Sequence, residues 1–284
     1  MKRHNTAIAG LVAAFAVWTG LTTGSGHAEQ LPLWEAGVGI AAISLPDYRG
    51  SNERQAWVLP YPYIVYRGEF LQADERRVRG LFFKSDRLEL DVSVNGSVPV
   101  DSSENDARRG MPDLDGTLEI GPALNVLLTQ TEHSKSRLEL RLPVRAVLAS
   151  DFSYVRQVGW VFHPHLNLDV ADPLGYAGWN LGLLAGPLVT DRRYNRYFYG
   201  VEQPFATANR PAYGAGGGYA GTQLIAALSK RYRQFWVGGF VKWDTLNGAA
   251  FADSPLVKDK QGVSAGFSIA WVLGESKTRV ETKR

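Results

Sequence analysis

The chain has 284 residues, no cysteine, 31 basic and 28 acidic side chains, and a formal net charge of +3. Without cysteine it can hold neither a disulfide framework nor a thiolate-bound zinc, and an exported form cannot carry a lipid on an N-terminal cysteine. The nearly balanced charge leaves no basic stripe of the kind that binds nucleic acid.

The first 28 residues have the composition of a secretory signal peptide. Lys2 and Arg3 form a basic start, an apolar stretch follows from Ala7 to Leu21, and small residues flank His27 just before Glu29. The alternative is an N-terminal membrane anchor, which the short apolar stretch disfavours. We expect cleavage after residue 28. The mature chain then loses two basic and no acidic residues, so its net charge falls to 29 − 28 = +1.

Two segments alternate strictly between apolar and charged or polar side chains. In residues 87–100 and 137–148, leucine, valine and alanine occupy one parity, and arginine, glutamate and aspartate lie on the other. Successive side chains of a strand point to opposite faces, so each segment has one apolar and one ionic face. Both segments exceed the length of a typical soluble strand and match the roughly 9–11 residues that cross a bilayer.

The whole sequence predicts about twelve strands. The chain after residue 28 contains no apolar run long enough for a transmembrane helix, so a membrane crossing must use strands. An unpaired sheet edge is costly in hydrocarbon, so the first and last strands must pair. We therefore predict an all-β fold, a transmembrane antiparallel up-and-down β-barrel over residues 29–273. Its strands are expected at 33–44, 55–66, 69–75, 77–84, 87–99, 116–130, 136–149, 156–170, 177–187, 214–229, 233–245 and 262–273.

The connections between these strands alternate in length. A barrel whose termini face the periplasm has short turns on that side and longer loops outside, whereas a soluble sandwich has no reason to sort its loops. Tryptophans near strand ends fit the two membrane interfaces. A soluble β-protein with core aromatics is the alternative, which the alternation within residues 263–273 disfavours. The long connections are expected at 45–54, 100–115, 188–213 and 246–261.

The ionic parity is expected to line a polar lumen, where opposite charges can pair and fill the interior. The expected lining residues are Arg87, Glu89, Asp91, Arg137, Glu139, Arg141 and Arg145. Residues 274–284 form a polar C-terminal tail with a net charge of +2, which we expect to be disordered in the periplasm.

Three long loops contain the candidate interaction residues. One interpretation is structural, with Tyr48 packing over the barrel mouth. The other is that the loops form a binding surface in which arginines beside aromatic rings contact lipopolysaccharide phosphates or a ligand. The candidate residues are Pro46, Tyr48, Arg49, Arg192, Arg193, Tyr194, Arg196, Tyr197, Asp253, Ser254 and Pro255.

The loop motifs occur in a fixed order: PDYRGS at 46–51, DRRY at 191–194 with YFYGV at 197–201, and DSPLV at 253–257. This ordered set resembles the MipA/OmpV family of Gram-negative outer-membrane proteins over essentially the whole mature chain. One departure is the polar tail, because outer-membrane barrels commonly end on an aromatic residue.

The resemblance implies a cell outer-membrane protein that contacts lipid and lipopolysaccharide. It implies a scaffold or interaction protein of the cell envelope that links a murein lytic transglycosylase to a penicillin-binding protein. The alternative functions are a small-solute channel and an outer-membrane receptor or adhesin. The oligomeric state is left open.

The residues give little support for catalysis. The predicted mature chain has three histidines, His133, His163 and His165, and only the last two are expected on one face of a strand. Acyl-transfer hydrolysis needs a nucleophile, a base and an orienting group together. A His-x-His pair can bind a metal, but we find no third ligand at a useful spacing. We expect no enzymatic activity, no cofactor and no metal.

Overall fold

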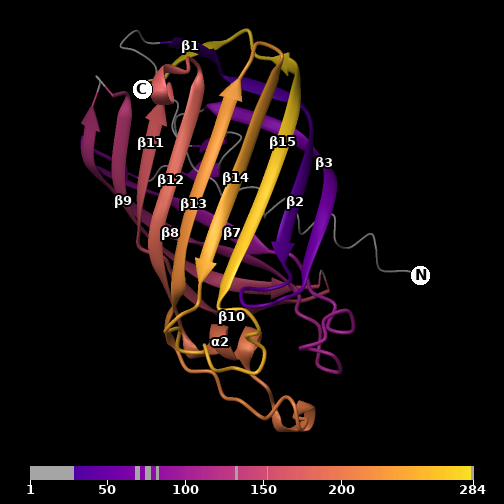
Figure 1. The fold of residues 1–284 in the computed structure, drawn as a ribbon. Helices are drawn as coiled ribbons and strands as arrows, with labels where there is room; N and C mark the ends of the chain where they lie inside the picture. Colours follow the sequence, from indigo (N-terminus) through magenta and orange to yellow (C-terminus); the bar gives the residue numbers. More distant parts are fainter. Residues whose placement is uncertain are drawn as a thin grey trace.

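The computed structural model describes residues 29–67, 71–73, 78–80, 83–131, 134–151 and 153–282 (Figure 1). The predicted signal peptide, residues 1–28, and His133 lie outside the described residues. The strands are β1 (Glu29–Pro32), β2 (Trp34–Pro46), β3 (Arg54–Arg67), β4 (Leu71–Ala73), β5 (Val78–Gly80), β6 (Phe83–Lys84), β7 (Leu88–Ser97), β8 (Gly116–Thr131), β9 (Ser136–Ser150), β10 (Val155–Phe162), β11 (His165–Ala171), β12 (Trp179–Thr190), β13 (Gly218–Arg231), β14 (Phe235–Thr245), β15 (Gln261–Glu275) and β16 (Arg279–Thr282).

Fourteen of these strands form one antiparallel sheet in the order β5-β4-β3-β2-β15-β14-β13-β12-β10-β9-β8-β7-β6, with β11 between β12 and β9. β10 and β11 share the same two neighbours and are interrupted only at residues 163–164. β5 and β6 are separated only by residues 81–82. If each of these pairs is counted as one strand, the sheet has 14 − 2 = 12 strands, in agreement with the sequence prediction.

The sheet curls so that its two ends approach each other (Figure 1). One end is β5, which pairs with β4, and the other is β6, which pairs with β7. Cα atoms of β5 and β7 come within 8 Å of one another. The two ends of the described sheet therefore lie side by side, as an up-and-down β-barrel requires.

The two faces of the strands are sorted as the alternation predicts. On β7, Leu88 is exposed outward, while Glu89 and Asp91 are buried. On β8, Ile120 is 40% exposed and its neighbour Glu119 only 7%. The apolar parity therefore faces outward and the ionic parity faces the lumen. Arg87 is a correction, because it is exposed beside the turn that precedes β7.

Short turns and long loops gather at opposite ends of the barrel (Figure 1). The loop between β12 and β13 contains an α-helix, α2 (Arg192–Tyr199), and a 3-10 turn, η3 (Gln203–Phe205); a second 3-10 turn, η2 (Pro173–Gly175), lies in a short turn. The strand pattern did not predict α2. None of the helices in the described part of the chain is long and apolar enough to cross a membrane.

The C-terminal tail corrects a second expectation. β15 continues to Glu275, and β16 pairs with β1 in a separate two-stranded sheet, from Glu29↔Thr282 to Pro32↔Arg279. The Ser276 N–H donates to the Trp34 carbonyl at 2.8 Å, which ties this small sheet to the barrel. The disorder predicted for residues 274–284 is therefore wrong for the described part of the tail.

Candidate functional site

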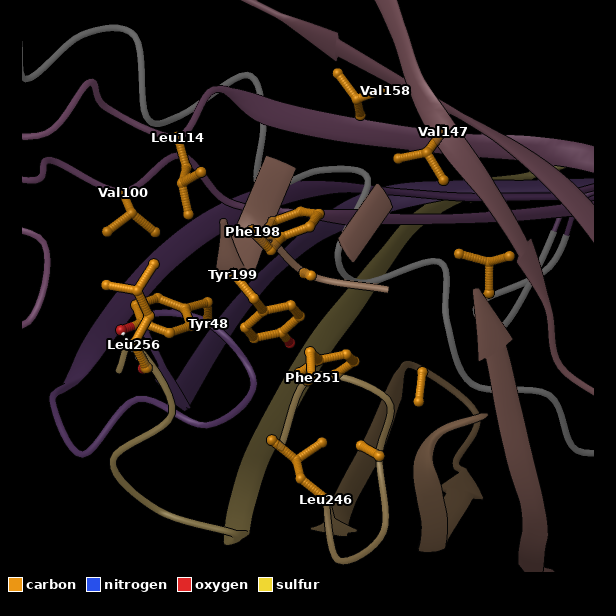
Figure 2. Close-up of a cluster of buried hydrophobic side chains, with 14 of the residues drawn as sticks. Tyr48, Val100, Leu114, Val147, Val158, Phe198, Tyr199, Leu246, Phe251 and Leu256 are labelled. Carbon is orange, nitrogen blue, oxygen red and sulfur yellow. Dashed lines mark hydrogen bonds between the residues drawn. The ribbon is translucent and has the colours of Figure 1, made fainter. Parts of the chain in front are cut away.

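The long loops fold together around one apolar core and cover the outer mouth of the barrel. We call these assembled loops the cap. Tyr199 of α2 stacks on Phe251 with ring centroids 3.7 Å apart. Figure 2 shows Tyr48 and Leu256 beside this pair, each from a different loop. Inward side chains of the barrel, Val147 and Val158 among them, belong to the same core, so the cap is seated inside the mouth.

Hydrogen bonds between loops hold the cap together. The Tyr48 hydroxyl donates to the Leu256 carbonyl at 2.8 Å, and the Tyr199 hydroxyl donates to the Arg49 carbonyl at 3.0 Å. The Ser254 hydroxyl donates to the Tyr199 carbonyl at 2.7 Å. Three loops far apart in sequence are thus fixed to one another by buried polar contacts, which are costly to leave unpaired.

Helix α2 is positioned by its N-cap residue. The Asp191 carboxylate accepts hydrogen bonds from the N–H of Tyr194 at 2.9 Å and from the N–H of Trp160 on β10 at 3.1 Å. Gly159 makes this close approach possible, because a Cβ there would lie 2.5 Å from the carboxylate. The helix therefore lies against the inner side of β10, and burial raises the pKa of Tyr194 well above its usual value.

The outward side of the cap carries a small polar cluster around Asp115. The Tyr197 hydroxyl accepts a hydrogen bond from the Asp115 N–H at 2.8 Å, and the Tyr154 hydroxyl donates to the Asp115 carboxylate at 2.9 Å. Arg156 lies 5.1 Å from the Tyr197 ring centroid. Burial, together with the negative charge of Asp115, raises the pKa of Tyr197 to about 12.

Charges fill the lumen below the cap. Glu139 lies between Arg137 at 2.5 Å and Arg141 at 2.6 Å, and Arg145 contacts Glu119 at 2.8 Å. Nearer the cap, Asp244 is shared by Arg49 at 2.9 Å and Lys242 at 3.2 Å. At the periplasmic end Glu35 accepts from Arg67 and Arg231, both at 2.7 Å. The expected pairing of opposite charges in the lumen is confirmed.

The cap brings the three predicted loops together but divides the candidate residues by exposure. Arg192, Arg193, Arg196 and Asp253 are exposed, whereas Tyr48 and Ser254 are buried in the core. The remaining candidates, Pro46, Arg49, Tyr194, Tyr197 and Pro255, have intermediate exposure. The four exposed side chains are therefore the most accessible of the candidates to a partner.

Sequence reasoning missed the role of the loop between β7 and β8. Asn105, which is fully buried, donates to Asp47 at 2.8 Å. Arg108 is 2% exposed and donates to the Phe198 carbonyl at 3.2 Å. Arg210 donates to the carbonyls of Ala107 and Arg109, both at 3.0 Å. These polar residues look solvated in the sequence, and no local signal marks them as buried.

The two described histidines lie where one strand is interrupted. His163 follows β10 and His165 begins β11; their ring centroids are 4.6 Å apart, and both are buried. The Nδ1 atom of His165 lies 2.7 Å from the His163 carbonyl oxygen. Among the described residues, no group of three or more histidines and carboxylates has the geometry to hold a metal ion.

Comparisons with known proteins agree with this architecture. The family model described as MltA-interacting protein MipA matches residues 38–273. The outer membrane protein OmpV of Vibrio cholerae is 26% identical over 218 residues, which cover 72% of this chain and 75% of that protein. The outer membrane protein Omp26La of Vibrio anguillarum is 25% identical over 218 residues, with the same coverage of both chains.

Proposed function

Because the chain belongs to the family of the MltA-interacting protein MipA, we propose that it is an envelope scaffold that holds a murein lytic transglycosylase beside a penicillin-binding protein. The chain is an outer-membrane protein, as the Vibrio relatives are. The family description names an interaction rather than a reaction, and the proposed activity is therefore binding.

The observation that carries the proposal is the filled and capped lumen. Glu139 and Arg141 are 3% and 4% exposed, and the cap core includes fully buried Phe251 directly above the charged interior. A channel needs a hydrated path, whereas a scaffold needs rigid surfaces. The closely paired charges in the lumen and the packed mouth of the barrel therefore favour the scaffold over the small-solute channel.

The periplasmic face offers a partner several ordered features. The β1–β16 sheet lies there, and its backbone is tied to the barrel by Arg67 of β3, whose N–H donates to the Leu33 carbonyl at 2.8 Å. Short turns at the same end are also fixed, for example by the Lys135–Asp172 ion pair at 2.5 Å. Preformed surfaces bind with a smaller loss of conformational entropy than flexible ones.

Affinity capture tests the scaffold. The tagged mature chain, solubilised gently from outer membranes, should retain a purified MltA-type transglycosylase. A variant truncated after Glu275, which removes β16, should retain less enzyme. An Arg192→Gln/Arg193→Gln/Arg196→Gln variant, altered at the opposite end, serves as the matched control and should retain it fully. Failure of the full chain to retain the enzyme would remove the murein role.

Conductance measurements in planar bilayers separate the scaffold from the channel. We expect no steady single-channel current from the intact chain, because cap and ion pairs occupy the lumen. Steady currents from the unmodified protein would instead favour the channel.

A second candidate function is recognition of lipopolysaccharide phosphates by the cap. Arg192, Arg193 and Arg196 are exposed on α2, and guanidinium groups bind phosphate strongly. The triple glutamine variant should lose affinity for lipopolysaccharide but not for its dephosphorylated form. Arg233→Gln, an exposed arginine of the periplasmic turn after β13, is the matched control.

A further inference from the structure

Among the described residues, no strand pairs with the outer half of β3 on the side away from β2. β3 pairs with β2 along its whole length, but its described pairs with β4 are limited to Tyr66 and Arg67. On the other side, β6 reaches only as far as Leu90 of β7. Ala73 and Val78 pair with each other, and neither β4 nor β5 has a described pair with the outer half of β3.

The sequence of β3 is suited to such an edge. Pro60 and Pro62 have the same parity and cannot donate a backbone hydrogen bond. The ladder with β2 runs through both positions without a register shift, so the missing N–H groups belong to the side away from β2. Prolines within sheets occur on edge strands, at the first residue of a strand or at bulges, and the unshifted register excludes a bulge with β2 here. The outer half of β3 is thus an edge strand by sequence as well as by pairing.

The lumen side of this sector carries a row of apolar side chains. Trp57 pairs with Ile43, which in turn lies beside Gly266 and Phe240 in one row across four strands. The Phe240 ring lies over Gly266, where a Cβ would meet it at 2.6 Å. In the same way Tyr61 lies over Gly39, where a Cβ would be 2.4 Å from the ring.

This aromatic wall is partly exposed to the lumen. Trp57, Leu59 and Phe240 are intermediate in exposure and pack against a cluster of Ile43 and Val98. Val98 follows β7 directly, so the cluster spans the outer end of the interrupted wall. Below it, the edge of β3 and the lumen-facing apolar side chains lie next to each other at membrane depth.

An excess of positive charge lies at the outer end of the aromatic wall. Lys242 is on the same face of β14 as Phe240, two residues nearer the cap. Its partner Asp244 also pairs with Arg49, so two cations share one carboxylate. The Lys242 side chain is 24% exposed. An apolar wall that ends at a site with one excess positive charge is complementary to an anionic amphiphile.

We propose that this wall binds a single-chain anionic amphiphile, such as a long-chain carboxylate, that enters from the bilayer between β3 and β7. The alkyl chain lies along Leu59, Trp57 and Phe240, and the carboxylate pairs with Lys242. Entry from the membrane agrees with the cap, which covers the outer mouth. This binding site is separate from the periplasmic surface assigned to the scaffold role.

Photo-crosslinking locates the site. The full mature chain in phosphatidylcholine nanodiscs is labelled with stearic acid that carries a mid-chain diazirine, and labelled peptides are identified by mass spectrometry. Labelling should saturate and fall on β3 and β14. Leu59→Asn, which points inward, should weaken binding about tenfold, and its outward neighbour Val58→Asn, 72% exposed, should not. An equal effect of both variants, or unsaturable labelling, would mean lipid on the outer surface and would overturn the site.

Charge selectivity gives an independent readout that does not depend on variant stability. Lys242→Gln should lower the affinity for stearic acid about tenfold and leave that for neutral stearyl alcohol unchanged. Lys230→Gln, at the periplasmic end of β13, is the matched control. Equal loss for acid and alcohol would contradict the role of Lys242. Crosslinks between the β3 strands of two copies would show that the edge is covered by a second chain and would also overturn the proposal.

Discussion

At the scale of single residues, the cap is stabilised by tyrosines whose hydroxyl groups are used inside a protein core. Tyr48 and Tyr199 are 5% and 2% exposed, yet each donates to a backbone carbonyl of another loop. Burial raises the pKa of both phenols. Each ring contributes apolar area and each hydroxyl fixes one loop against the next, so the loops have one defined arrangement.

This arrangement predicts that the cap loosens at alkaline pH. Tyr197 has a pKa of about 12 in the folded chain, above the usual value near 10, so folding favours its protonated form. The stabilisation is complete below pH of about 10 and is lost as the pH rises through about 12. Absorbance of tyrosinate at 295 nm should therefore show a late-titrating group that Tyr197→Phe removes. Titration of all twelve tyrosines near pH of about 10 would contradict a packed cap.

The ion pairs of the lumen predict a large cost for the loss of one charge. Glu139→Gln leaves Arg137 and Arg141 without their closest anion, and Arg141 is 4% exposed. An uncompensated buried charge costs about 3–5 kcal/mol. Urea unfolding in detergent micelles measures the difference. Asp253→Asn, in a pair whose carboxylate is 92% exposed, should change the stability by less than about 0.5 kcal/mol.

At the scale of elements, glycines in β2, β14 and β15 allow aromatic rings to lie flat on the inner side of the sheet. Trp236 covers Gly238, where a Cβ would be 2.2 Å from the ring, and Tyr61 and Phe240 cover glycines in the neighbouring strands. The glycines weaken strand propensity, and the rings restore contact over the bare backbone. The aromatic wall is therefore built by pairing small residues with large ones.

Two glycines of β15 give a matched test of this packing. A Cβ at Gly266 would lie 2.6 Å from the Phe240 ring and 2.9 Å from Ile43, whereas a Cβ at Gly262 would meet nothing within 4 Å. Gly266→Ala should therefore destabilise the barrel by about 1–3 kcal/mol. Gly262→Ala should be neutral or slightly stabilising, because alanine restricts the unfolded chain more. Thermal unfolding followed by gel mobility of the folded form measures both; equal effects would contradict the packing.

The success of the sequence prediction varies with how local the determining contacts are. The strands can be predicted from alternation alone, because the polarity of neighbouring residues such as Glu89 and Leu88 indicates which side chain faces the lumen and which faces outward. Helix α2 could have been predicted from the Asp191 N-cap and Gly200, but a helix of only 8 residues shows little helical periodicity. Strand β16 could not be predicted from the sequence, because its partner β1 lies at the other end of the chain. Burial of Arg108 depends on several loops meeting, which no local pattern encodes.

At the scale of the whole molecule, apolar side chains face outward and charged side chains face the centre, the reverse of a soluble protein. The outer surface of the barrel must therefore contact lipid. Apolar side chains are exposed on every long strand of the sheet, for example Ile40, Val144 and Phe267 at 47%, 40% and 57%. Exposed apolar area of this extent is not found on monomeric soluble proteins. Charged side chains fill the centre instead, and the loops at one end supply an apolar core of their own.

This arrangement predicts that the cost of an outward charge depends on its depth. Leu124 is near the middle of β8 and Leu128 is close to its periplasmic end, and both face outward, at 37% and 49% exposure. In phospholipid vesicles, Leu124→Arg should destabilise the barrel by about 2–4 kcal/mol and Leu128→Arg by about 0–1 kcal/mol. Reversible urea unfolding in vesicles measures the difference. If the more exposed Leu128 cost as much as Leu124, this surface would not be in contact with a bilayer, because water offers no such gradient along a strand.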